Sequence, residues 1–415
     1  MIHHTSYLFT SHAMIPRFVD FINIKRVSQW LLLLVVLVQG CASVPPRNPL
    51  PPESYNDAQI AGIPHARYWG DAAPPYADEW FAASDAEVRK RNPAVYGKEH
   101  HLLAISGGGA KGAFGAGLLA GWSAAGTRPQ FAMVTGISAG ALIAPFAFLG
   151  SEYDAPLNEV FTQSSTEDMI TKRGKLEALS GDAMADTSPL RAMIVKFVDD
   201  EMVQAIAEEY RKGRELYIGT TNLDALRPVI WDIGRIANSG VPGAKNLIHD
   251  ILLASASIPV TFPPVMIEVE AGGQRYDEMH VDGGATTQVF LYPLGIDWRR
   301  VERKLAVKGT PQVYLIRNSM LKPRWKTTER KLRPIAGRTV SSLIRTQGIG
   351  DMYRIFLGVK RDGLVYRLAY IPGDFAVESK EPFDTEYMNK LYELGFNMAK
   401  QGYPWDKTPP GLTTK

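Results

Sequence analysis

The chain has 415 residues, 45% of them hydrophobic, which is enough to bury a large core in one large domain or in one domain with an extension. Its formal net charge of +3 falls to +1 without residues 1–40, which hold three basic and one acidic side chain, and this balance argues against a nucleic-acid binder. A single cysteine excludes an intramolecular disulfide, so stability must come from the core.

Residues 1–40 have the pattern of a secretory signal peptide. Lys25 and Arg26 precede an uninterrupted apolar run at residues 30–38, and this run is too short to span a bilayer. A start at Met14 would give a leader of more ordinary length. We therefore expect an exported protein.

Cys41 follows this leader in the order Val-Gln-Gly-Cys, which resembles the lipobox of bacterial lipoproteins, although Gln39 stands where a small residue is usual. The resemblance implies cleavage before Cys41 and lipidation of its thiol. A plain signal peptide with an unmodified cysteine is the alternative. Because Ala42 rather than aspartate comes next, the sorting rule of enteric lipoproteins implies an anchor in the outer membrane, facing the periplasm.

Two segments separate this leader from the first motif. Residues 41–58 are rich in proline and suit an extended tether between a lipid anchor and a folded body. Residues 59–100 carry too many aromatic side chains for a free linker. We expect them to pack on the domain, with a short helix from about Ser84 to Arg91.

A glycine run follows the strand-like segment at residues 102–105. The run consists of Gly107, Gly108, Gly109, Ala110, Lys111 and Gly112. It satisfies the Gly-x-Gly-x-x-Gly pattern of dinucleotide-binding folds, but residues 121–134, where that pattern expects an acidic residue, contain none. A P-loop is excluded because glycine and alanine follow Lys111. The remaining interpretation is an anion-binding turn for a transient oxyanion.

Residues 113–122 are expected to form an amphipathic helix directly after this turn. Phe114, Leu118 and Trp122 recur at helical spacing among small residues, so the small face would pack closely. The helix N-terminus would direct unpaired N–H groups at the same point as the glycine run. Lys111 would hold the loop or add positive charge, and a solvated lysine is the alternative.

Ser138 lies between Gly136 and Gly140 in a Gly-x-Ser-x-Gly pattern. An apolar run at residues 131–135 precedes it and a run rich in alanine and leucine at residues 139–148 follows, which predicts the strand, sharp turn and helix of a nucleophile elbow. Because the pattern also arises by chance in a chain with 37 glycines, the prediction depends on this strand-turn-helix context. A serine nucleophile further needs a base and donors for the oxyanion.

Asp282 is the best-placed base. It comes directly after a strand-like segment at residues 276–281, and Gly283 and Gly284 leave room beside its carboxylate. An aspartate before two glycines is ordinarily a turn residue, which is the competing interpretation.

Two histidines, His249 and His280, provide another base. Either one, together with Asp224 or Asp232, would complete the Ser-His-Asp triad of an α/β-hydrolase esterase. The glycine run and the Asp-Gly-Gly sequence would then have no explanation. A third hypothesis is a lipid-anchored binding protein that has the same fold but no catalytic activity.

Three motifs, Gly-Gly-Gly-x-Lys-Gly, Gly-x-Ser-x-Gly and Asp-Gly-Gly, occur in this order, and over about residues 100–290 they resemble the patatin-like phospholipases. The segment at residues 254–264 adds to the resemblance, since it looks like the helix end and proline-rich turn found before the aspartate of that family. Each motif is weak alone, but their ordered combination is specific.

The resemblance implies a Ser-Asp dyad, with Ser138 as the nucleophile and Asp282 as its base. It implies hydrolysis of acyl esters of phospholipids or other membrane lipids, of the phospholipase A or lysophospholipase type, with no cofactor and no metal. Backbone N–H groups of the glycine run would form the oxyanion hole. The residues implied for that hole are Gly107, Gly108, Gly109 and Ala110. The residues implied to support the motifs are Lys111, Gly112, Gly136, Gly140, Gly283 and Gly284.

Strand-like and helical segments alternate along the chain, which predicts an α/β fold with three layers, α/β/α, around a mainly parallel sheet. We expect a catalytic domain at residues 101–290. Residues 291–415 would extend the same body, with a helix at 384–400 and a basic stretch that starts at about 318. The expected strands are at 216–220, 229–233, 265–270, 276–281 and 312–317. Besides the lipid substrate and the membrane, the sequence indicates no partner.

Overall fold

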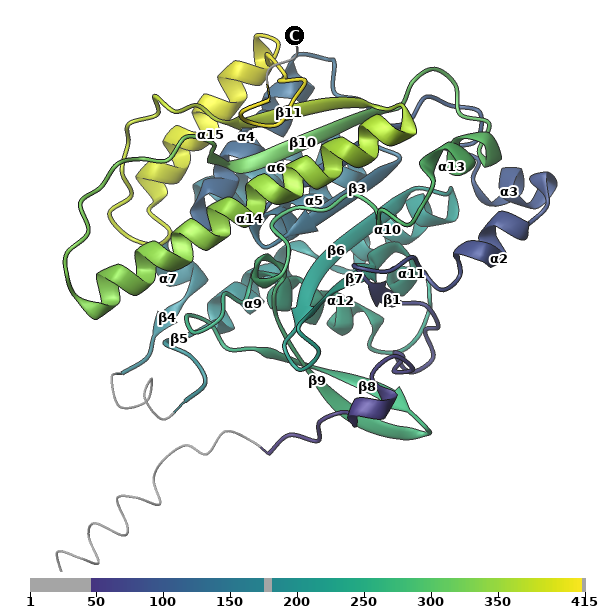
Figure 1. Ribbon diagram of the computed structural model, residues 1–415, viewed down its shortest axis with the longest axis horizontal. Helices are drawn as coiled ribbons and strands as arrows, with labels where there is room; N and C mark the ends of the chain where they lie inside the picture. Colours follow the sequence, from purple (N-terminus) through teal and green to yellow (C-terminus); the bar gives the residue numbers. More distant parts are fainter. Residues whose placement is uncertain (1–45, 175–180, 413–415) are drawn as a thin grey trace, which may run out of the picture. The chain divides into compact units, whose positions relative to one another are not determined.

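The computed structural model describes residues 46–174 and 181–412 (Figure 1). The predicted signal peptide and Cys41 lie outside these residues, so export and lipidation stay predictions. In the described ranges, none of the helices has the length and apolar character that a membrane span requires.

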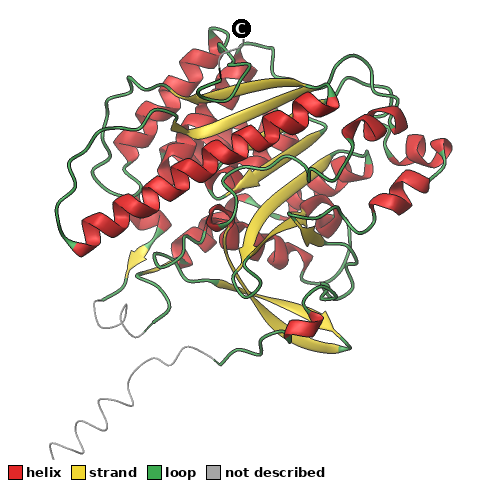
Figure 2. Cartoon of the chain, in the orientation of Figure 1, coloured by secondary structure: helices red, strands yellow, loops and turns green. Residues whose placement is uncertain are grey.

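A nine-stranded mixed sheet forms the centre of the described part of the chain (Figure 2). Five consecutive strands, which reach one edge of the sheet, run parallel, and the remaining four pair antiparallel with their neighbours. This confirms the predicted α/β fold with a mainly parallel sheet. Along the sheet the strands are β1 (Arg67–Trp69), β7 (Arg227–Asp232), β6 (Glu215–Asn222), β3 (Met133–Ile137), β2 (His101–Ile105), β10 (Gln312–Met320) and β11 (Val365–Ile371), with β9 (Gln274–Asp282) on β6 and β8 (Val265–Ala271) on β9.

Both faces of the central strands are buried, which explains why they read as continuous apolar runs. Successive side chains of β2 point to opposite faces: Leu103 and Ile105 enter one core, and Leu102 and Ala104 enter the other. Helices cover both cores, so the fold has the three expected layers.

The helices divide between the two faces of the sheet. The first core is built with α4 (Gly112–Ala124), α5 (Ala139–Leu149), α6 (Asp154–Thr162), α9 (Ser188–Phe197), α10 (Asp200–Arg211), α11 (Ile233–Ala237), α12 (Ala244–Ala256) and α15 (Thr385–Lys400). The second core is covered by α13 (Trp298–Lys304) and α14 (Leu332–Asp362), and α14 crosses this face in Figure 1. The short elements are α2 (Ala77–Ala82), α3 (Asp85–Arg91), α7 (Thr166–Met169), β4 (Thr171–Lys172), β5 (Ala185–Asp186) and the 3-10 turns η1 (Pro52–Ser54), η2 (Gly109–Lys111), η3 (Ser151–Tyr153) and η4 (Gly283–Ala285).

The prediction that the helix at residues 113–122 is amphipathic is wrong, because α4 is buried around its whole circumference from Gly112 to Trp122. The cause lies far away in the sequence: α15 packs against the side that would otherwise meet water. The small residues do allow close packing. A Cβ atom at Gly117 or Gly121 would overlap the backbone of α15.

The N-terminal segments lie along the edge of the sheet. Residues 46–58 do not run free as an extended tether, since Asp277 on β9 donates its N–H to the Asn48 carbonyl (2.7 Å). Farther along, β1 pairs with β7, and the Arg67 guanidinium forms a buried ion pair with Glu278 on β9. The helix expected from about Ser84 to Arg91 is α3, which starts with a Ser84 capping box.

The C-terminal part completes the sheet. β10 pairs with β2, and β11 pairs with β10, both in parallel. β11 and α14 have no counterpart among the sequence predictions, whereas α15 matches the helix expected at 384–400.

Candidate active site

Ser138 occupies a strained turn between β3 and α5. Its φ of 56° and ψ of −126° are rare for a residue with a side chain. The flanking glycines allow this turn because a Cβ atom at Gly136 would overlap the carbonyl oxygen of Gly140, and one at Gly140 would overlap that of Ile105. Ser255 stabilises the turn by accepting a hydrogen bond from the Ser138 N–H (3.0 Å). The strand, turn and helix expected around Ser138 are therefore present.

The register of three strands brings Asp282 to Ser138. Ile137, the last residue of β3, pairs with Gly219 on β6, and the next β6 residue, Thr220, pairs with Asp282 at the end of β9. The Ser138 hydroxyl lies near the Asp282 carboxylate and acts to lower the pKa of that carboxyl. Their exposed fractions are only 7% and 5%.

The Asp282 carboxylate is held by its own turn. Its Oδ1 atom accepts a hydrogen bond from the Gly284 N–H (2.7 Å), and its N–H donates to the Ser257 carbonyl (2.8 Å). A Cβ atom at Gly283 would come within 2.6 Å of the Gly219 carbonyl oxygen, so this turn needs a glycine. Burial raises the pKa of Asp282 to about 6, although its hydrogen bonds act in the opposite direction. A carboxylate with this pKa is suited to accept a proton near neutral pH.

The glycine run lies directly against the serine. A Cβ atom at Gly107 would lie 3.0 Å from the Ser138 Cβ and 3.6 Å from its Oγ. The Gly107 N–H donates to the Gln288 carbonyl (3.2 Å) and so holds the loop in place. Contrary to the prediction, this amide is not a free donor for the oxyanion hole. Gly108, Gly109 and Ala110 lie at the start of η2, which leads into α4, where the first N–H groups of a helix lack intrahelical acceptors.

Positive charge gathers beside this loop. Partial desolvation and the guanidinium groups of Arg317 and Arg324 lower the pKa of Lys111. Arg317 is buried, and its Nη1 atom has no hydrogen-bond partner among the described residues. Burial lowers the pKa of Arg317 to about 10, so it stays protonated at neutral pH. Lys111 thus has two guanidinium groups in its neighbourhood.

Asn318, at the carboxyl end of β10, is a site residue that the sequence prediction missed. Its amide donates to the Ser106 carbonyl (2.9 Å) and accepts from the Gly115 N–H (3.1 Å), and its backbone N–H donates to the Ser106 hydroxyl (2.9 Å). A Cβ atom at Gly108 would come within 2.5 Å of the Asn318 carbonyl oxygen. Asn318 therefore fixes both the glycine run and the start of α4. Its position at the carboxyl end of a parallel strand next to β2 is the signal that could have identified it.

The two candidate histidines are engaged elsewhere. His280 is fully buried, with Nε2 against Glu278 (3.0 Å) and Nδ1 against Thr220 (2.9 Å). His249 directs Nε2 to the Val198 carbonyl (2.7 Å).

The aspartates proposed for the triad also have other partners. Asp224 is paired with Arg47, and Asp232 caps α11 by accepting the Arg235 N–H. These contacts do not assemble a Ser-His-Asp triad.

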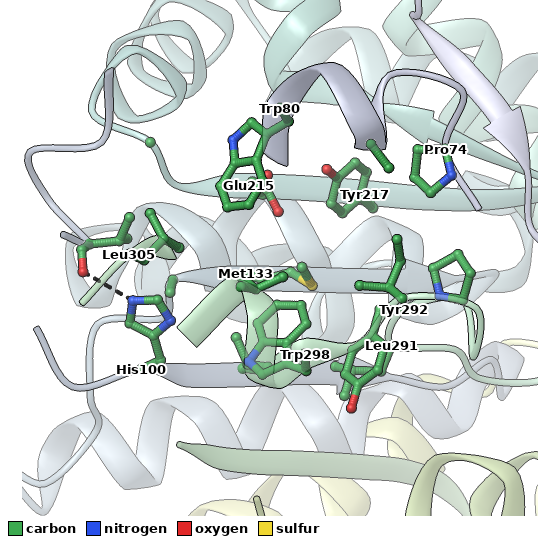
Figure 3. Close-up of a pocket in the computed structure, with 18 of the residues that line it drawn as sticks. Pro74, Trp80, His100, Met133, Glu215, Tyr217, Leu291, Tyr292, Trp298 and Leu305 are labelled. Carbon is green, nitrogen blue, oxygen red and sulfur yellow. Dashed lines mark hydrogen bonds between the residues drawn. The ribbon is translucent and has the colours of Figure 1, made fainter. Parts of the chain in front are cut away.

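A cavity of about 120 Å³ opens at the other end of the strands, near their first residues Met133 and Glu215 (Figure 3). Figure 3 shows Trp80, Tyr217 and Trp298 among its labelled lining residues. Because Ser138 follows the carboxyl end of β3, this cavity is separate from the candidate active site.

One comparison with known proteins identifies a family. A family model described as patatin-like phospholipase matches residues 103–294. These residues form a patatin-like phospholipase domain. The resemblance seen in the sequence is thus confirmed, and the domain belongs to a family of lipid acyl hydrolases, which are enzymes of the esterase class.

Among solved structures, the chain is similar to VipD from Legionella pneumophila at 12% sequence identity and a TM-score of 0.37. The similar region covers 73% of this chain and 66% of VipD, just under two thirds of that protein. The comparison with curated proteins finds no match.

Proposed function

We propose that the protein hydrolyses acyl esters of membrane lipids with a Ser138–Asp282 dyad, as a phospholipase A or lysophospholipase. The observation that supports this most directly is the register of β3, β6 and β9, which brings the buried Asp282 carboxylate to Ser138 at a strained turn beside the glycine run. No histidine is needed for this proposal.

Each step of the reaction has a group to perform it. Ser138 attacks the ester carbonyl carbon while Asp282 takes the serine proton, and the N–H groups of Gly108, Gly109 and Ala110 bind the resulting oxyanion. The ester C–O bond then breaks, and Asp282 returns the proton to the departing alcohol. Water, deprotonated by Asp282, releases the fatty acid and restores the serine.

The cationic group beside the glycine run supports a phosphate-bearing substrate. Lys111, Arg317 and Arg324 place positive charge next to the loop, and Arg317 keeps a buried donor unpaired. Guanidinium groups bind phosphate oxygens well, whereas a neutral acylglycerol offers them no charge. We therefore favour phospholipids and lysophospholipids over neutral lipids.

The test is product identification by mass spectrometry after incubation with a defined mixture of phospholipids and acylglycerols. We expect free fatty acid and lysolipid from the parent protein, and a loss of several orders of magnitude in Ser138→Ala and Asp282→Asn, with non-additive losses in the double variant. Mild, additive losses contradict the dyad. A loss in His280→Ala or His249→Ala as complete as in Ser138→Ala, in folded protein, supports the triad instead.

A fluorophosphonate probe separates an enzyme from a binding protein. Labelling requires an activated serine, so we expect labelling of the parent protein at Ser138 and none in Ser138→Ala. Folded parent protein that stays unlabelled supports the non-catalytic hypothesis.

We also propose that the protein is exported and anchored through a lipid on Cys41, in the outer membrane facing the periplasm. The signal-peptide pattern and the resemblance to a lipobox support this. Cells grown with labelled palmitate should label the parent protein and not Cys41→Ser. Equal labelling of both proteins would refute the anchor.

A further inference from the structure

The N-terminal half of α14 presents an apolar face to solvent. Its apolar side chains recur at i, i+3, i+8, i+11 and i+12, which places them on one side of the helix. Such a face is ordinarily buried against a core, yet here Leu332 and Leu343 are 85% and 65% exposed. The exposed apolar side chains of this face are Leu332, Ile335, Val340, Leu343 and Ile344.

The same segment holds the positive charge of the molecule. Residues 322–345 contain eight basic side chains and one acidic one, whereas the whole chain has a net charge of only +3. The rest of the protein is therefore net negative. Trp325, in the connection between β10 and α14, is 94% exposed within this basic stretch. Basic and aromatic side chains beside an apolar helical face are typical of helices that lie in a membrane interface.

The exposed half continues into a buried half that touches the candidate active site. Gln288 donates its side-chain N–H to Gln347 (3.2 Å) and its backbone N–H to Asp351 (2.7 Å) on α14. Gln288 also donates to the Gly284 carbonyl (2.7 Å), in the turn that holds Asp282. The apolar face thus ends, at Ile344, within one helical turn of Gln347, which contacts the residue that supports this turn.

We propose that residues 322–346, the α14 surface, dock the protein on an anionic lipid surface. The apolar face enters the boundary between headgroups and acyl chains, and the basic side chains contact the headgroups. Charge complementarity favours this occupant over a second copy of the chain, because two copies would bring like charges together. Docking needs no hydrolysis, so the inference extends beyond the proposed function and does not depend on it.

The test is co-sedimentation with vesicles of phosphatidylcholine, with and without phosphatidylglycerol. The protein is the polypeptide from residue 42, which lacks the proposed anchor, with Ser138→Ala to keep the lipids intact. We expect binding to the mixed vesicles that weakens as salt concentration rises. Equal binding to both vesicle types, or none to either, would overturn the proposal.

Paired variants locate the surface. Leu332→Ser with Leu343→Ser removes apolar contact, and Arg333→Gln with Arg338→Gln removes charge. We expect each pair to weaken binding at least tenfold, and the charge pair also to reduce the salt dependence. Matched controls are Leu357→Ser, an equally exposed leucine (63%) in the other half of α14, and Lys308→Gln, an exposed lysine outside the segment. Parental binding by the paired variants, or equal losses in the controls, would refute the assignment.

Two further measurements separate this surface from other roles. All the substituted side chains are exposed, so melting temperatures should stay unchanged. When the same variants carry an intact Ser138, their rate of hydrolysis of a soluble short-chain ester should also stay unchanged. If sedimentation gives a dimer for the parent and a monomer for the leucine pair, the face binds a second copy and the lipid proposal is wrong. Failure to hydrolyse any ester would refute the proposed function while leaving the vesicle result intact.

Discussion

At the scale of single residues, Asp282 sets the pH range in which the proposed dyad works. Its carboxylate must be ionised to take the Ser138 proton, and burial raises its pKa to about 6. We predict that kcat/KM for a soluble ester is constant above about pH 7 and falls tenfold per pH step well below 6. A falling limb centred near pH 4 would contradict the role of a buried base.

The same burial predicts a cost in stability. The pKa of Asp282 is about 6 in the folded state and 3.8 when unperturbed. The stability that the protonated carboxyl contributes is therefore fully present below about pH 4 and is lost as pH rises through 6. Above pH 7 the cost is at most roughly 3 kcal/mol. Asp282→Asn should therefore melt at a higher temperature than the parent at pH 8, and calorimetry should find the gap closing towards pH 4. A gap that does not change with pH would contradict this account.

Asn318 is predicted to matter for both folding and turnover. Asn318→Ala removes the hydrogen bonds that its amide makes with the Ser106 carbonyl and the Gly115 N–H, and a buried polar group left unpaired costs roughly 1–3 kcal/mol. We expect a lower melting temperature and a lower kcat with little change in KM, since the oxyanion donors shift. Asn238→Ala, which loses only an exposed contact with Arg211, is the control. An unchanged kcat would place Asn318 outside the site.

At the scale of elements, the contact of α4 with α15 decides what the glycines of α4 do. A methyl group at Gly117 would overlap the Tyr392 backbone, so Gly117→Ala must separate the helices, at a cost of roughly 1–3 kcal/mol or more. Gly350→Ala on α14 meets no atom within 4 Å and should stabilise by roughly 0.5–1 kcal/mol. Thermal denaturation of both variants checks the signs. Equal effects would mean that helix propensity, and not packing, governs both positions.

The elements that could be predicted share one property. Strands such as β2, β3 and β6 are buried on both faces, so their apolar runs are visible in the sequence itself. The burial of α4 was not predictable, because the helix that covers it comes some 270 residues later. α14 was missed because the apolar positions of its N-terminal half face solvent and Pro334 and Gly337 interrupt the pattern there.

At the scale of the whole molecule, the segment that carries the motifs depends on later parts of the chain to fold. The family match ends at residue 294, but β10 pairs with β2 and β11 with β10 in the same sheet, and α15 covers α4. A polypeptide of residues 103–294 would expose an unpaired strand edge and one side of a buried helix. We predict that it is insoluble or lacks a cooperative unfolding transition, whereas residues 46–412 unfold cooperatively. A stable, folded 103–294 fragment would refute this dependence.

The identity of the site residues was readable in the sequence because their chemistry is local. Gly136 and Gly140 flank Ser138 within five positions, and the Asp282 turn needs only the two glycines that follow it. Their meeting depends on the register of β3, β6 and β9, which no local pattern encodes. The same holds for Asn318 and for the exposed face of α14, since burial and exposure are decided by segments hundreds of residues apart. Short-range sterics therefore determined the turns, whereas only long-range packing decided which charges and carbonyls surround them.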